Sequence, residues 1–107
     1  MQVNISGHHV DVTPALRAYA TEKLQRLSRH FDQVASVDVI LKVEKHQQQA
    51  EATVKAAGRT LFGNASAEDM YAAIDGLSDK LDRQVRRVKQ RLRDNHHGRS
   101  EDVASGF

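Results

Sequence analysis

The residues best suited to chemistry are the lysines and arginines between positions 80 and 93. This segment holds seven bases and one acid, a net charge of +6. Residues 1–79 hold eight bases and ten acids, and residues 94–107 hold one base and three acids, so each carries −2. A block of one sign favours a polyanionic partner such as nucleic acid, because a solvated helix face normally mixes signs. Charge alone leaves the solvated face open as an alternative.

The spacing of these bases indicates two stripes on helices. Steps of 3, 4 and 4 residues place four bases on one side of a helix: Lys80, Arg83, Arg87 and Arg91. Steps of 3 and 3 residues place three more on an earlier helix: Lys23, Arg26 and Arg29. If the two helices lie side by side, the stripes flank a positive groove that suits a phosphate backbone. Cationic side chains that only cover apolar helix flanks are the simpler alternative. Arg86, Lys89 and Arg93 fall on the other flank and are interpreted as general electrostatics.

Patterns that would indicate catalysis or metal binding are missing from the sequence. The absence of cysteine excludes a disulfide scaffold and a thiolate metal site. The adjacent histidine pairs 8–9 and 96–97 lack the i, i+4 spacing and the carboxylates of a zinc site. Asp75, Asp79 and Asp82 alternate with bases and are interpreted as partners of those bases on the helix surface. We therefore expect no enzymatic activity, no metal and no cofactor.

Aromatic residues are few, which bears on how a nucleic acid could be bound. Phe62 falls on the outward phase of its predicted strand and is the one candidate for stacking on a base, although a partly buried ring is expected there. Contact with the backbone of folded RNA is therefore favoured over recognition of bases.

Apolar periodicity predicts the two helices that position the stripes. Residues 68–93 form a long amphipathic helix whose apolar positions are Met70, Ile74, Leu77, Leu81, Val85, Val88 and Leu92. Residues 14–31 form a first helix capped by Thr13, with apolar positions at Leu16, Ala20, Leu24, Leu27 and Phe31. Ser66 with Asp69 three residues later matches a capping box at the start of the long helix.

Alternating apolar and polar residues predict four strands, at residues 2–7, 36–44, 50–56 and 60–65. Residues 46–49 are expected to form a polar connection. Small residues on one strand face would let a helix approach closely: Ala50, Ala52, Gly63 and Ala65. The order β-α-β-β-β-α predicts an α+β two-layer sandwich, a four-stranded sheet with both helices on one face.

The chain is expected to be one domain, residues 1–93, followed by a flexible tail, residues 94–107, which has no apolar period. No run approaches the 18 apolar residues of a membrane span, and no apolar signal segment follows Met1. The expected location is the cytoplasm, with no membrane partner.

A run at the start of the long helix resembles the signature of the bacterial ribosome hibernation-promoting factors. It reads Asp69-Met70-Tyr71-Ala72-Ala73-Ile74-Asp75, followed by Leu77, Lys80, Leu81, Arg83 and Gln84. Residues 1–5 and 41–45 also resemble the short form of that family, and the resemblance covers about residues 1–93. The wider family includes the ribosome-associated inhibitor Y and the sigma-54 modulation proteins.

The resemblance implies a fold similar to double-stranded-RNA-binding domains and a role on the ribosome. Members bind 16S rRNA of the 30S subunit, in the channel across the A and P tRNA sites, and exclude tRNA and mRNA in stationary phase. The short form acts with a ribosome modulation factor to join 70S ribosomes into inactive 100S dimers, and is expected to be monomeric off the ribosome. The family's basic positions carry over at Lys23, Arg26, Arg29, Lys80, Arg83 and Arg87, with Arg91 extending the line.

An alternative within the same family is an inhibitor of the Y type, which silences 70S monomers and opposes dimerisation through a C-terminal tail. Residues 94–107 exceed the minimal short form, whereas residues 41–45 and 72–75 are closer to the hibernation factor. Both alternatives remain open at the level of sequence.

Overall fold

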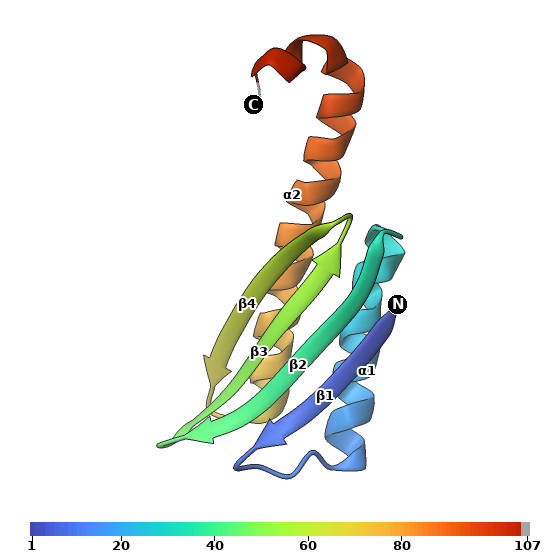
Figure 1. The fold of residues 1–107 in the computed structure, drawn as a ribbon. Helices are drawn as coiled ribbons and strands as arrows, with labels where there is room; N and C mark the ends of the chain where they lie inside the picture. The colour runs from blue at the N-terminus through green and yellow to red at the C-terminus, as the bar shows by residue number, and fades with distance from the viewer. Residues whose placement is uncertain (106–107) are drawn as a thin grey trace.

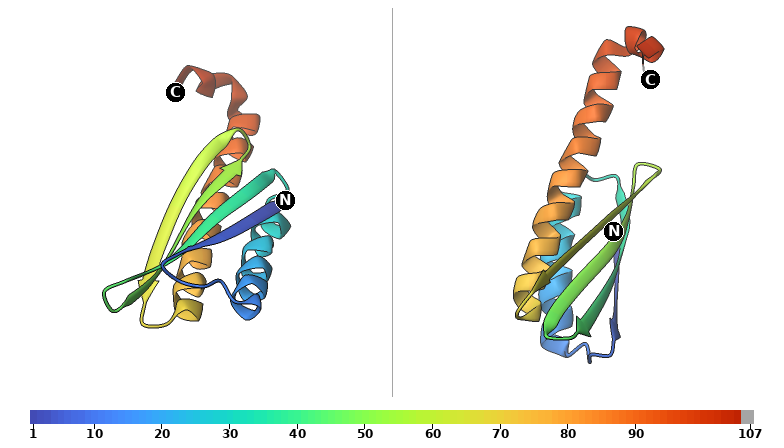
Figure 2. Two further views of the ribbon diagram at one scale, coloured as in Figure 1. Left: turned by 60° about the horizontal axis from the view of Figure 1, so that its bottom comes forward. Right: turned by 90° about the vertical axis from the view of Figure 1, so that its left-hand side faces the viewer.

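A single four-stranded sheet carries both helices on one of its faces (Figure 1 and Figure 2). The computed structural model describes the backbone of residues 1–105 and the side chains of residues 1–93. Sheet order is β1-β2-β3-β4, with β1 parallel to β2 and the other neighbours antiparallel. The predicted α+β two-layer sandwich is confirmed. The elements are β1 (Gln2–His8), α1 (Pro14–His30), β2 (Val34–Glu44), β3 (Gln47–Ala56), β4 (Arg59–Ala67) and α2 (Met70–Ser105).

Helix α1 begins as predicted and ends one residue early. The Thr13 hydroxyl accepts a hydrogen bond from the Leu16 amide at 3.1 Å, and Pro14 occupies the first turn, where its missing N–H costs nothing. Phe31 has an extended backbone, but its amide still donates to the Leu27 carbonyl at 3.0 Å. The buried Phe31 ring therefore belongs to the core although the residue itself lies just beyond the helix.

The start of α2 differs from the predicted capping box. The Asp69 carboxylate accepts a hydrogen bond from the Ala72 amide at 2.9 Å, so Asp69 is the N-cap residue itself. Ser66 lies in β4, paired with Gln49 of β3, and the strand continues to Ala67. Pairing with β3 therefore outweighs the local Ser-x-x-Asp pattern, and the predicted start at residue 68 is wrong by two residues.

The other end of α2 is also displaced, since the helical backbone runs past Arg93 to Ser105. No proline interrupts residues 94–105, and adding one residue to an existing helix costs far less than starting one. The side chains of residues 94–107, and all of 106–107, lie outside the described part of the chain. Residues 94–105 are described by their helical backbone alone, so the flexible tail predicted for 94–107 stays a prediction.

The strands are longer than predicted, and in β3 the added residues 47–49 are glutamines, which carry no apolar period. Strand β3 begins at Gln47, so the predicted polar connection at 46–49 contracts to a tight turn at Lys45 and His46. Lys45 has φ 58°, in the left-handed region, which closes this turn. Gln48 and Gln49 pair with residues of both β2 and β4.

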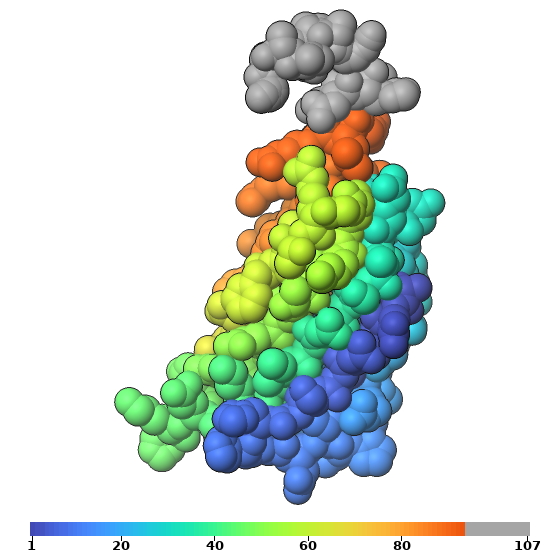
Figure 3. Space-filling view, viewed as in Figure 1, coloured from blue at the N-terminus to red at the C-terminus, as the bar shows by residue number. Residues whose placement is uncertain are grey.

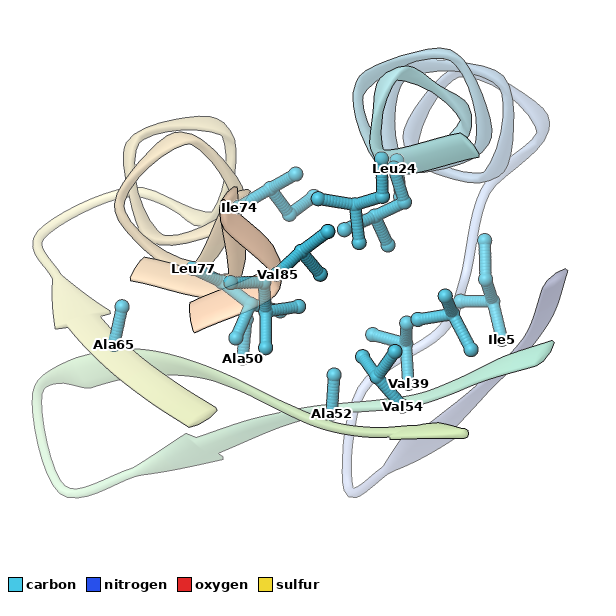
Figure 4. Close-up of a cluster of buried hydrophobic side chains, with 14 of the residues drawn as sticks. Ile5, Leu24, Val39, Ala50, Ala52, Val54, Ala65, Ile74, Leu77 and Val85 are labelled. Carbon is cyan, nitrogen blue, oxygen red and sulfur yellow. The ribbon is translucent and has the colours of Figure 1, made fainter. Parts of the chain in front are cut away.

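The hydrophobic core fills the space between the sheet and the helices (Figure 4). Four leucines are fully buried: Leu24, Leu27, Leu77 and Leu81. Burial of each leucine side chain stabilises the fold by about 1.5–3 kcal/mol. α2 packs on β3 and β4, whereas α1 packs on β1 and β2. As predicted, small residues on the sheet let α2 approach closely. A Cβ atom at Gly63 would lie 2.9 Å from Cδ2 of Leu81.

The opposite face of the sheet is not covered by a helix (Figure 3). Ile40 is 42% exposed and Phe62 is 56% exposed, so the expectation of a partly buried Phe62 ring is wrong. Nothing in the described part of the chain packs over that ring as a second layer.

Within the described residues, none of the helices combines the length and hydropathy that a membrane crossing requires.

Replacing the capping residue of α2 tests its assignment. We expect Asp69→Ala to lower the free energy of unfolding by about 0.5–2 kcal/mol, because the Ala72 amide loses its acceptor. Ser66→Ala, the matched control, should change it by less than about 0.5 kcal/mol. Urea denaturation followed by circular dichroism measures both. A larger loss for Ser66→Ala would restore the capping box predicted from the sequence.

Candidate nucleic-acid interface

A polar seam joins the first half of α1 to the first half of α2. The Tyr19 hydroxyl donates to Oδ1 of Asp75 at 2.6 Å, and Nζ of Lys23 lies 3.2 Å from the same oxygen. The Ser78 hydroxyl donates to the Lys23 carbonyl at 3.4 Å. The Tyr19 and Tyr71 rings pack edge to face, with their centroids 4.9 Å apart. Lys23 is therefore half-buried and paired with an acid of the other helix, whereas the bases further along the helices are exposed.

The hydrogen bond between Tyr19 and Asp75 shifts the pKa values of the two side chains in opposite directions. Its donation to the carboxylate is the main reason that the pKa of Asp75 is lowered, and Lys23 adds to that effect. The same bond raises the pKa of the Tyr19 hydroxyl, since the proton is held by the neighbouring negative charge. Asp75 is thus charged at neutral pH and serves to fix the two helices together.

Basic residues surround the seam near the end of α1. Nη2 of Arg86 lies 3.1 Å from Oδ2 of Asp82, and Nε2 of His30 lies 3.7 Å from its Oδ1. Nζ of Lys89 donates to the His30 carbonyl at 2.8 Å. The predicted pairing of acids with bases on the helix surface is confirmed for Asp82 and Arg86, whereas Asp75 pairs across to α1. A hollow of about 350 Å³ opens here, lined by Arg29, His30, Arg86, Lys89, Gln90 and Arg93.

A second row of bases follows the flank of α2 that faces β4. Nζ of Lys80 donates to the Asn64 carbonyl at 2.8 Å, which fixes this flank against the strand. Arg87 and Arg91 line a hollow of about 120 Å³ together with Leu61 of β4. Arg83 is exposed and lies three residues from Lys80 and four from Arg87, on the same side of the helix.

The sequence therefore predicted the wrong α2 residues for the groove between the two helices. Lys80, Arg87 and Arg91 lie on the β4 side of α2, away from α1. The bases of α2 that meet Arg29 are the three assigned to general electrostatics, namely Arg86, Lys89 and Arg93. Arg26 lines an adjoining hollow with Asp79, Asp82 and Arg86.

The sequence contained one signal for the correct flank. Ser78 is the only polar residue among the buried side chains of the described residues, and it lies between Asp75 and Asp82 at steps of 3 and 4. In the structure this side of α2 contacts α1, since Asp75 and Ser78 bond to residues of α1 and Lys89 bonds to the His30 carbonyl. Periodicity alone predicts a stripe but not which neighbour the stripe faces.

The helix layer thus presents two rows of cations, one along each side of the outer surface of α2. The exposed bases are Arg26, Arg29, Lys80, Arg83, Arg86, Arg87, Lys89, Arg91 and Arg93. A surface of this kind attracts phosphates by charge and by charge-assisted hydrogen bonds. No group of three or more His, Cys, Asp or Glu residues that could hold a metal occurs in the described part of the chain.

Known proteins match this chain over most of its length. The family described as Sigma 54 modulation protein / S30EA ribosomal protein matches residues 3–93. A ribosome hibernation promoting factor from Pseudomonas putida is 57% identical over 91 residues, 85% of this chain and 89% of that protein.

Two solved structures share the fold. A ribosomal subunit interface protein from Coxiella burnetii has a TM-score of 0.79 and 32% identity, covering 84% of this chain and 99% of that one. The N-terminal domain of Thermus thermophilus Protein Y has a TM-score of 0.76 and 32% identity, covering 82% and 99%.

Removing the Tyr19 hydroxyl tests the seam. We expect Tyr19→Phe to raise the pKa of the Asp75 carboxyl toward its ordinary value, because the main cause of its lowering is lost. An NMR titration of the carboxyl carbons measures this, and Tyr71→Phe, which keeps the ring contact, is the control. An unchanged Asp75 pKa in Tyr19→Phe would contradict the assignment.

The same variant should alter the acid dependence of stability. A carboxylate with a lowered pKa stabilises the fold above its ordinary pKa, and this contribution is lost as the pH falls through the lower folded value. Tyr19→Phe should therefore reduce the loss of stability on acidification. The effect is small because the Asp75 side chain is 45% exposed and screened by solvent.

Proposed function

The chain belongs to the Sigma 54 modulation protein / S30EA ribosomal protein family, and we propose that it is a ribosome hibernation factor that binds 16S rRNA. The resemblance predicted from the sequence is confirmed by the family match and by relatives named ribosome hibernation promoting factor. Proteins of this family bind ribosomes and are not enzymes, so the expected lack of catalysis is also confirmed. Association with ribosomes makes the cytoplasm the proposed location.

One observation carries the rRNA proposal: the bases of residues 80–93 are exposed while the apolar side of the same helix is buried. Arg83, Arg87 and Arg91 have no ion pair within the described residues and keep their donors for phosphate oxygens, and the helix holds them in one row. The proposed contacts are Arg26, Arg29, Lys80, Arg83, Arg87 and Arg91. Lys23 stays in the set with a smaller contribution, because Asp75 engages its ammonium group.

The proposed mechanism is occlusion without covalent change. The domain occupies the small-subunit channel across the A and P tRNA sites, so tRNA and mRNA cannot bind while it is present. The proposed partners are the 30S subunit, 70S and 100S ribosomes and, functionally, a ribosome modulation factor. The protein is proposed to be monomeric when it is off the ribosome.

Charge reversal on the outer surface of α2 tests the contact. Arg83→Glu with Arg87→Glu should weaken small-subunit binding and reduce the slope of log affinity against log salt by about 1.4–1.8, since each phosphate contact contributes about 0.7–0.9. Lys80 is spared because its ammonium group bonds to β4. The measurement is 30S binding across a potassium chloride series.

The matched control changes the same net charge on the sheet side. Lys45 and Lys55 are exposed, and neither lies in the helix layer. Lys45→Glu with Lys55→Glu should leave the slope within about 0.5 of wild type. Equal effects of the two double variants would mean that overall charge, rather than the helix surface, governs binding.

The ribosomal state produced by the protein separates hibernation from the inhibitor-type alternative. Relatives named ribosome hibernation promoting factor support hibernation, for which we propose 100S dimers, and a solved neighbour named Protein Y keeps the inhibitor type, with silenced 70S monomers, as the alternative. Sucrose-gradient sedimentation of 70S ribosomes with the protein and a ribosome modulation factor should show 100S particles. Inhibited 70S monomers that become 100S dimers only after deletion of residues 94–107 would establish the alternative.

A further inference from the structure

The hollow at the end of the α1–α2 seam is small and lined mostly by cations. Its volume is about 350 Å³, near the lower end of ligand-binding cavities. Four of its six lining residues carry fixed positive charge: Arg29, Arg86, Lys89 and Arg93. A fifth, His30, can gain one. A smaller hollow of about 210 Å³ shares His30 and Arg86 and extends the depression along the seam.

Side-chain contacts hold two of these cations, Arg86 and Lys89, beside the end of α1. Asp82 binds Arg86 through Oδ2 at 3.1 Å. Its other oxygen, Oδ1, is buried, makes no hydrogen bond within the described residues and faces Nε2 of His30 at 3.7 Å. Lys89 bonds to the His30 carbonyl at 2.8 Å, which fixes the end of α1 against α2. Because Arg86 and Lys89 already have partners, these two side chains lose less freedom than unpaired ones when an anion binds, which raises affinity.

We propose that this hollow is a phosphate-binding site whose affinity increases when His30 is protonated. Arginine presents planar donors that match phosphate oxygens, and two of the three arginines here come from α2 and one from α1. The site deepens the proposed function, on which it rests in one respect: the expected source of the phosphate is the rRNA backbone. A free phosphorylated molecule has the same chemistry and is the other source.

The role of His30 follows from the charges that face it. Arg26 and Arg29 come from α1, and α2 contributes Asp79, Asp82, Arg86, Lys89 and Arg93. A phosphate bound among these cations would place its negative charge beside the His30 ring, and a protonated imidazole would add one more positive charge and N–H donor to the hollow. Phosphate binding and protonation of His30 therefore strengthen each other, as linkage requires.

Inorganic pyrophosphate is the probe for the isolated full chain. Saturable NMR shifts should appear in the His30 ring and in the Arg86 and Arg93 side chains, while the Arg83 and Arg87 side chains move less. The ratio of the affinity at pH 6 to that at pH 8 should be about three- to tenfold higher in wild type than in His30→Gln, since the protonation of pyrophosphate itself is common to both. A linear, non-saturating response spread equally over both flanks of α2 would overturn the site.

Small-subunit binding then identifies the source of the phosphate. In wild type it should strengthen by a similar factor between about pH 8 and pH 6, whereas His30→Gln should change by less than about twofold. His46→Gln, in the exposed turn between β2 and β3, is the control and should behave as wild type. If His30→Gln removes the pH dependence of pyrophosphate binding alone, the source is a free phosphorylated molecule and not rRNA.

The two proposals fail in different ways. An absence of any small-subunit binding by wild type contradicts the proposed function, and the pyrophosphate titration still decides the site. Normal small-subunit binding, with equal pH ratios for wild type and His30→Gln in both assays, contradicts the phosphate site and leaves the proposed function intact.

Discussion

The close packing of α2 on β3 and β4 is the constraint on which the rest of the structure depends. Gly63 faces Leu81 without a side chain of its own, and the Cβ of Ala65 lies 3.2 Å from where a Cβ would stand at Gly76. Because the sheet beneath is lined with small residues, the helix buries a narrow stripe and leaves both flanks exposed. A bulkier strand face would lift α2 and separate it from α1 as well.

The two flanks of α2 differ because they face different neighbours. The flank toward α1 is a seam in which Asp75, Ser78 and Asp82 contact the other helix, and its bases cluster where that seam ends. The flank toward β4 has no acid among its described contacts, and Lys80 and Gln84 bond to strand carbonyls. One helix therefore carries cations in two electrostatic settings, one balanced by carboxylates and one not.

The sequence was sufficient for the element order and the core because those depend on period alone. Leu24, Leu77 and Leu81 were predicted from spacing and are fully buried. The capping box at Ser66 was not, because a strand ladder decided where β4 ended. The groove between the stripes was mispredicted for a different reason. Periodicity groups residues on one side of a helix, but the direction of that side depends on long-range packing of α2 between α1 and β4.

Strand β4 lies at the edge of the sheet, where unpaired backbone groups can template pairing with another chain. The carbonyls of Phe62 and Asn64 on this strand accept hydrogen bonds from Gln84 and Lys80 of α2. The helix thereby covers part of the edge with its own side chains, in a strand whose Phe62 ring is exposed. By occupying these carbonyls, Lys80 and Gln84 leave fewer free acceptors on β4 with which another chain could pair.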